Sequence, residues 1–132
     1  MATVTAALTL TSSDLLTSSL SVSTSTSATA TATSGLSRRP ITSTAVGTAS
    51  GQVTLYTADD FAAISYVYVK NTDTTTTDYI YIFDDTTSGD PQILKLAGGD
   101  WAFLPTVADK TLKAYASTSG TVIEWMVFGT DQ

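Results

Sequence analysis

The acidic side chains are the residues of this chain whose types and spacing could do chemistry. The run from Asp84 to Asp90 (DDTTSGD) places three carboxylates around a glycine, and oxygen ligands of this kind bind Ca²⁺. The run lacks the spacing of an EF-hand loop, whose twelfth position requires a bidentate Glu. Because Asp, Thr, Ser and Gly are also the ordinary residues of exposed turns, we interpret the run as a solvated turn and expect no metal.

Three further acidic residues have a chemical interpretation. Asp59 and Asp60 are adjacent and could supply the paired carboxylates of a glycoside hydrolase. Neighbouring residues on a strand point to opposite faces, so a turn or cap is the favoured interpretation of this pair. Asp100 precedes Trp101, and an indole ring beside a carboxylate can form a sugar platform. We instead expect Trp101 in the core, opposite Leu96.

Composition excludes much catalytic and metal chemistry. The 132 residues include no His and no Cys, which rules out Ser-His and Cys-His relays, zinc fingers, iron–sulfur clusters and disulfides. We therefore expect a non-enzymatic protein without a cofactor. The net charge is −6 and only Arg38 and Arg39 form a basic pair, so neither nucleic acid nor an anionic membrane is an expected partner. No signal peptide or membrane span is expected from the sequence.

The length predicts one domain, but its first third differs from the rest. Residues 1–50 contain 25 Ser or Thr, three charged side chains and no aromatic residue. We predict that residues 1–50 form an arm or edge strands, and that residues 51–132 form the core. Residues 20–33 alternate apolar and hydroxyl side chains with a period of two, which indicates a strand of roughly 45 Å. A strand of this length is expected to bend, to break, or to leave its own subunit as an arm.

The second part predicts hairpins. If residues 63–70 pair with residues 79–83, Val67, Val69, Ile80 and Ile82 share one face. The other face then carries aromatic side chains, which are Tyr66, Tyr68, Tyr79, Tyr81 and Phe83. This stripe is interpreted either as a second inner face of a sandwich or as a contact surface, because Tyr is common at interfaces. With Leu20 and Val22 of the N-terminal third, these five residues form the candidate assembly interface.

Two more hairpins are expected near the C-terminus. The Gly98-Gly99 turn would pair Leu96 with Trp101 and Leu94 with Phe103. Residues 111–116 and 121–128 would pair through a Ser-rich turn, so that Tyr115 faces Val122 and Lys113 faces Glu124. No extended helix is expected. The predicted fold is all-β, an antiparallel β-sandwich or jelly-roll-like barrel of about eight or nine short strands with an extended Ser/Thr-rich N-terminal arm.

Residues 94–105 (LKLAGGDWAFLP) and 112–128 (LKAYASTSGTVIEWMVF) carry a resemblance to a known group. They resemble small virion structural proteins of tailed bacteriophages, particularly those of marine and cyanobacterial hosts. The resemblance implies a non-enzymatic building block of the virion, with a capsid decoration or cement protein favoured. Its implied partners are further copies of itself, with a trimer favoured, and the major capsid protein.

Two alternatives stay open beside a decoration protein. A tail component, such as a tube, adaptor or fibre-tip subunit, fits the same resemblance. A carbohydrate-binding β-sandwich module is a different class, in which Trp101, Tyr115 or the tyrosine stripe would form the sugar platform.

Overall fold

The computed structural model of the protein describes residues 2–14, 17–47, 50–63, 65–86 and 88–131. The chain divides into two compact units, Met1–Thr31 and Ala32–Gln132. This division lies earlier than the composition shift near residue 50, because residues 32–47 contribute strands and the fully buried Ile41 to the second unit. Among the described residues, no helix is long and apolar enough to cross a membrane.

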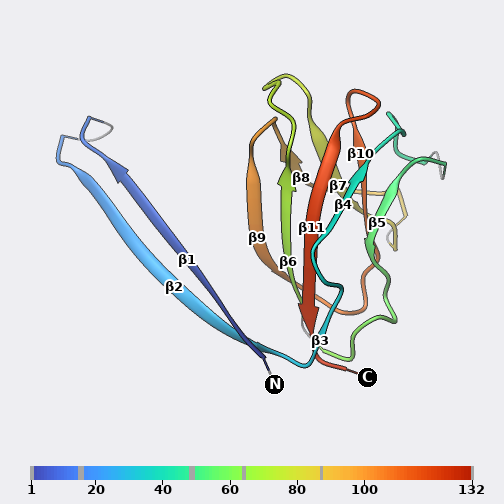
Figure 1. Ribbon diagram of the computed structural model, residues 1–132, viewed down its shortest axis with the longest axis horizontal. Helices are drawn as coiled ribbons and strands as arrows, with labels where there is room; N and C mark the ends of the chain where they lie inside the picture. The colour runs from blue at the N-terminus through green and yellow to red at the C-terminus, as the bar shows by residue number, and fades with distance from the viewer. Residues whose placement is uncertain (1, 15–16, 48–49, 64, 87, 132) are drawn as a thin grey trace. The chain divides into compact units, whose positions relative to one another are not determined.

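The first unit is a two-stranded antiparallel hairpin (Figure 1). Strand β1 (Ala2–Ser12) pairs with β2 (Leu20–Ala30) over eleven consecutive residue pairs, from Ala2 with Ala30 to Ser12 with Leu20. The alternation of Thr and Ser with apolar residues suits such a ladder, because β-branched side chains favour extended backbone. The strand expected from residue 20 to residue 33 therefore breaks after Ala30, and Ala32–Thr33 belongs to the second unit.

Within its described residues, the second unit contains nine strands in two sheets, which form the two layers of a sandwich in Figure 1. One sheet has the order β5-β10-β7-β8, and the other has the order β3-β11-β6-β9, with β4 also paired to β11. The strands are β3 (Ala32–Thr33), β4 (Ser37–Pro40), β5 (Val53–Tyr56), β6 (Ser65–Asn71), β7 (Ile80–Asp84), β8 (Gln92–Leu96), β9 (Trp101–Thr106), β10 (Leu112–Ala116) and β11 (Val122–Gly129).

The pairing between strands is nested. The β7–β8 hairpin lies innermost, and outward from it β6 pairs with β9, β5 with β10, and β4 with β11. A chain with this pairing is one long antiparallel hairpin of strand pairs that is folded over on itself. The additional β10–β7 and β11–β6 ladders join these strand pairs into two sheets. This is the topology of an eight-stranded jelly roll. The all-β antiparallel sandwich predicted from the sequence is therefore confirmed.

The three predicted hairpins are wrong. Strand β6 pairs with β11 and β9 and not with β7, so Val67 lies opposite Val127 and Leu104 instead of Ile82. The turn at Gly98-Gly99 carries the chain from one sheet to the other, as does the turn between β10 and β11. Lys113 and Glu124 consequently lie in different sheets, as do Leu96 and Trp101, Leu94 and Phe103, and Tyr115 and Val122. Each of these turns reverses the chain direction, but the strand that follows the turn belongs to the opposite sheet and does not pair with the strand before it.

The core lies between the two sheets. Alternate residues of each strand point inward, and the buried side chains include Val67 and Val69 of β6 and Ile80 and Ile82 of β7. The sequence pattern predicts one shared face for these four residues. All four are buried in the same core, but β6 and β7 contribute them from opposite sheets. Trp125 of β11 is also in the core. The side chains between these positions therefore form the two outer faces of the sandwich.

Strand β4 forms an edge of its sheet. Pro40 is opposite Val122 at the end of the β4–β11 ladder. Proline has no N–H to donate, so it is tolerated at an edge and not in a central strand. Pro40 therefore fits the edge position of β4.

Candidate assembly interface

The seven predicted interface residues lie on three separate surfaces. Tyr66 and Tyr68 belong to β6, whereas Tyr79, Tyr81 and Phe83 lie at or within β7 in the opposite sheet. Leu20 and Val22 belong to the hairpin of the first unit. The five aromatic residues thus do not form one stripe, because β6 and β7 are not neighbours.

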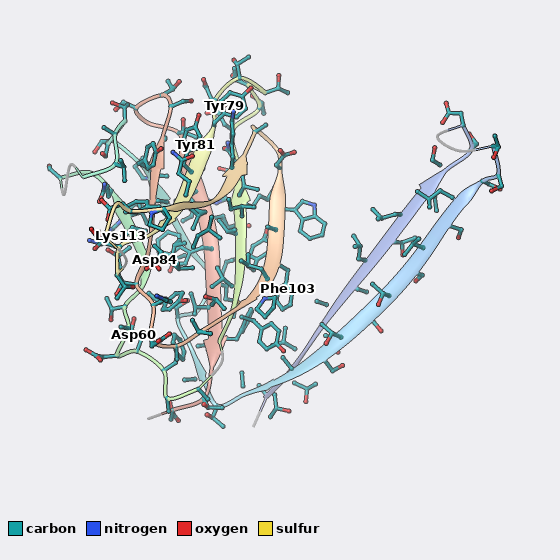
Figure 2. All side chains as sticks on the ribbon, turned by 180° about the vertical axis from the view of Figure 1, so that it is seen from behind. Asp60, Tyr79, Tyr81, Asp84, Phe103 and Lys113 are labelled. Carbon is teal, nitrogen blue, oxygen red and sulfur yellow. The ribbon has the colours of Figure 1, made fainter. Side chains whose placement is uncertain are left out.

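The outer face of the β3-β11-β6-β9 sheet carries a group of large side chains that we call the aromatic face. Its members alternate with core residues on three adjacent strands, and they are Tyr66, Tyr68, Trp101, Phe103, Met126 and Phe128. Tyr68 lies between Met126 and Phe103 across the ladders. The rings of Tyr66 and Phe103 stack with centroids 5.5 Å apart and planes 14° apart. Figure 2 shows Phe103 on its strand, β9.

Trp101 is the most exposed member of the aromatic face. Its side chain is 53% exposed, and it lies opposite Lys70 at the end of the β6–β9 ladder. The core position expected for Trp101 is wrong, because Ala102 and Leu104 are the β9 residues that pack against the core. An exposed indole on a sheet face is a feature of protein–protein contacts, where Trp is enriched.

A polar network crosses one end of the aromatic face. Glu124 of β11 accepts hydrogen bonds from Arg38 Nη2 at 2.6 Å and from Arg38 Nε at 3.1 Å, and it also accepts one from the Tyr68 hydroxyl at 3.0 Å. The bonds from Arg38 and Tyr68 lower the pKa of Glu124 below its ordinary value. Burial and the bond to Glu124 raise the pKa of Tyr68. The network fixes the orientation of the Tyr68 ring on the sheet.

The outer face of the other sheet also carries aromatic rings, but these rings largely cover one another. The rings of Tyr81 and Tyr115 stack at 4.9 Å with planes 17° apart, and Phe83 contacts Tyr115 edge-on at 5.9 Å. Lys95 Nζ lies 3.8 Å from the centre of the Tyr79 ring. Phe83 is fully buried, so it cannot itself contact a partner. Figure 2 shows Tyr79 and Tyr81 on this sheet.

The hairpin of the first unit has two chemically different faces. Residues directly opposite each other in an antiparallel ladder share a face. Leu10 is opposite Val22, Leu8 is opposite Thr24, and Leu20 is opposite Ser12, so the four aliphatic residues lie on one face near the turn. We call Leu8, Leu10, Leu20 and Val22 the distal patch. The opposite face carries hydroxyls, of which Thr5 Oγ1 and Ser27 Oγ lie 3.2 Å apart.

Two of the three carboxylates in the run from Asp84 to Asp90 are occupied by protein contacts. Asp84 accepts hydrogen bonds from the Thr86 N–H and hydroxyl and lies 3.3 Å from Lys110 Nζ, while Asp85 pairs with Lys113 at 2.5 Å. Thr87 of the predicted turn lies outside the described residues. In the described ranges no group of three or more acidic side chains is arranged to hold a metal ion.

The Asp59–Asp60 pair is part of a turn. The Asp60 carboxylate accepts the Thr57 N–H at 2.7 Å, and the Asp60 N–H donates to the Thr57 carbonyl at 3.1 Å. Asp60 also borders a groove of about 310 Å³ in the second unit, whose other walls include Tyr56, Phe61 and Leu55. The groove therefore has one acidic side chain, which already caps its own turn.

Comparison with known proteins finds no matching family model, no matching curated protein and no matching solved structure.

Sequence reasoning missed several members of these surfaces. Phe103 and Trp101 were assigned inward because a hairpin with β8 was assumed. Leu8 and Leu10 were not singled out, although their alternation with Thr9 and Thr11 is the signal of a two-faced strand. Met126 lies between Trp125 and Val127, which point into the core, so the same period of two places Met126 on the outer face.

Proposed function

We propose that the protein is a non-enzymatic structural subunit of a tailed-bacteriophage virion, most specifically a capsid decoration or cement protein. The resemblance of residues 94–105 and 112–128 to small virion proteins supports the virion assignment. The aromatic face supports a role in docking onto an assembled partner. The major capsid protein of the shell is the partner proposed for that face.

The observation that carries the proposal is the aromatic face of a fully formed domain, whose members are half-buried except for the exposed Trp101 and the buried Phe128. The jelly roll has its own core, so Trp101 is not needed there and instead lies 53% exposed beside Phe103. Contiguous exposed apolar side chains mark interaction sites, and Trp and Tyr supply much of the binding energy at such sites. The Arg38–Glu124–Tyr68 network holds part of this surface in a fixed orientation, which lowers the entropic cost of docking.

Stabilisation of a shell by such a subunit would follow from mass action. A protein that binds the closed shell and not its dissociated parts shifts the equilibrium toward the shell, by about 2.7 kcal/mol per site at a concentration of 100 times the Kd. Many copies on one lattice add their contributions without requiring tight single contacts.

Co-sedimentation with empty shells of the phage that encodes the protein tests the proposal. The wild-type chain should sediment with shells, and Trp101→Ala and Tyr68→Ala should weaken binding about tenfold or more. Ile93→Ala is a matched control, because Ile93 is 49% exposed on β8 of the opposite sheet. Its binding should equal that of the wild type. Equal losses for Trp101→Ala and Ile93→Ala would remove the aromatic face from the proposal.

The tail and carbohydrate alternatives give different results in the same preparations. A tail component would co-purify with detached tails and leave shells in the supernatant. A carbohydrate-binding module would bind glycan as a purified protein. The mutual stacking of Tyr81 and Tyr115 disfavours a sugar platform on their sheet, since a sugar stacks on an open ring face.

A further inference from the structure

The hairpin of β1 and β2 has no aromatic side chain, and its aliphatic side chains larger than Ala all lie on one face. Leu8, Leu10 and Val22 of the distal patch are 39%, 47% and 41% exposed. Exposed aliphatic residues grouped on one face of a sheet normally have a covering partner. A two-stranded hairpin is also marginally stable on its own in water, so covering this face would stabilise the element itself.

The two edges of the hairpin lack the features that usually protect exposed strands. Strands β1 and β2 form a two-stranded sheet, so each has an outer edge. Neither strand contains Pro or a charged side chain, and the eleven-pair register has no bulge. Natural proteins block exposed edges with charges, prolines or bulges. Long edges without these features favour pairing with another chain.

The distribution of charge identifies the partner class. Asp14 is the one charged side chain within residues 1–31, so residues 32–132 carry the other eleven acidic and all six basic side chains. Copies of the second unit have the same net negative charge and repel each other. The hairpin unit is the part of the chain where two copies can approach with the least repulsion between like charges, since each copy has only Asp14 there. It also lacks the aromatic and Arg anchors with which surfaces commonly select a different protein.

We infer that the hairpin joins copies of this chain, with the distal patch of one copy packed against the distal patch of a second copy. An isologous contact of this kind requires a self-complementary surface, and an uncharged aliphatic patch satisfies that requirement. The distal patch shares no residue with the aromatic face, so the inference does not rest on shell binding. An isologous contact through one patch gives a dimer, and the mass measurement below distinguishes this dimer from the trimer that the resemblance implies.

Solution mass tests the inference on the full chain. Light scattering over a concentration series should show association of the wild type. The double variant Leu10→Thr/Val22→Thr should weaken it about tenfold or more, because it removes one cross-strand aliphatic pair from each copy while keeping residues that suit a strand. The control is Thr9→Ala/Ser23→Ala, a directly opposite pair on the hydroxyl face, and it should associate like the wild type.

The fold of each variant can be checked independently. Both tryptophans, Trp101 and Trp125, lie in the second unit, so their fluorescence and the melting of the jelly roll should not change in either double variant. A wild type that stays monomeric throughout the series overturns the inference. So does an association that survives Leu10→Thr/Val22→Thr.

Chemical cross-linking provides a second readout, because the chain has no cysteine. Val22→Cys places a thiol in the distal patch, and Ser23→Cys places one on the opposite face of the same strand. A short bis-maleimide should link two copies of Val22→Cys well before two copies of Ser23→Cys, since stacked sheets lie about 10 Å apart and the outward thiols lie farther apart than that. Equal rates for the two variants contradict patch-to-patch packing. If the wild type does not bind shells but Val22→Cys cross-links as expected, the proposed function is rejected and the inference about the hairpin stands.

Discussion

The Tyr68 hydroxyl donates a hydrogen bond to Glu124 Oε1 at 3.0 Å and so joins β6 to β11 on the outer face of the sheet. Glu124 is the only Glu of the chain, and its other oxygen accepts the guanidinium of Arg38 from the edge strand β4. Three adjacent strands are therefore tied together at one end of the aromatic face. The residues involved are 56 and 86 positions apart in the sequence, so only the folded sheet brings them together.

Glu124→Gln should make the stability of the protein less dependent on pH. Because the folded-state pKa of Glu124 is lowered, its carboxylate contributes stability that is present above the ordinary value of 4.5 and is lost as pH falls through the folded pKa. The variant should lower the free energy of unfolding by about 1 kcal/mol at pH 7. Its difference from the wild type should shrink toward zero near pH 3. Urea unfolding at several pH values measures both effects.

A double-mutant cycle provides the control for this prediction. Arg38→Gln alone should lose a similar amount of stability at pH 7, and adding it to Glu124→Gln should cost little more. A wild-type-to-variant difference that stays constant from pH 7 to pH 3 would mean that the charge of Glu124 contributes nothing to stability.

Asn71→Ala should destabilise the jelly roll by about 3 kcal/mol. Asn71 is fully buried, and its side-chain amide donates to the carbonyls of Asp78 and Leu96 at 2.8 and 3.2 Å while its side-chain oxygen accepts the Asp73 N–H at 3.1 Å. The alanine leaves one buried and two part-buried backbone groups without their partner. Thr74→Ala, at an exposed position of the same loop, should change stability by less than about 0.5 kcal/mol in the same urea titration. Similar losses for both variants would contradict a special role for Asn71.

The sequence predicted the strand class and the inward residues better than the pairing. Alternation placed Val67, Val69, Ile80 and Ile82 correctly inside, because a period of two is a local property of a strand. Pairing is not local. Both β6 and β7 are central strands with neighbours on each side, and apart from β8, which directly follows β7, those neighbours come from distant parts of the chain.

The aromatic face illustrates the consequence of a wrong pairing. A strand has two faces, and a neighbour must be known before one of them can be assigned to the core. Assuming that β9 pairs with β8 put Trp101 and Phe103 beside Leu96 and Leu94. The actual partner of β9 is β6, and Ala102 and Leu104 point inward there. The ion pairs Lys113–Asp85 and Arg38–Glu124 could not be predicted from the sequence for the same reason, since each joins strands whose pairing was not known.

The two glycines of the β8–β9 turn should differ in their tolerance of alanine. A Cβ at Gly98 would lie 2.3 Å from the Thr75 carbonyl oxygen, so the backbones of two loops would have to separate. Gly99 has open space around a Cβ but a φ of +87°, which costs an L-residue about 1–2 kcal/mol. Thermal unfolding should therefore show a larger loss for Gly98→Ala than for Gly99→Ala. The reverse order would contradict the close packing of the two loops.

The two tryptophans should respond differently to a water-soluble quencher. Trp101 is 53% exposed, whereas Trp125 is 8% exposed and lies in the core. Acrylamide should quench the fluorescence of Trp101 and leave most of that of Trp125, so Trp101→Ala removes the strongly quenched component. Trp101→Ala should cost about 1 kcal/mol or less, and Trp125→Ala about 3–5 kcal/mol. Strong destabilisation by Trp101→Ala would return this side chain to the core.

The rupture temperature of empty shells tests the proposed function most directly. Scanning calorimetry of shells with increasing amounts of the purified protein should show a rupture temperature that rises with protein concentration and then saturates, as expected for a ligand that binds only the closed shell. Trp101→Ala should need a higher concentration for the same rise, and Ile93→Ala should behave like the wild type. A rupture temperature that stays constant at saturating wild-type protein would contradict a decoration protein.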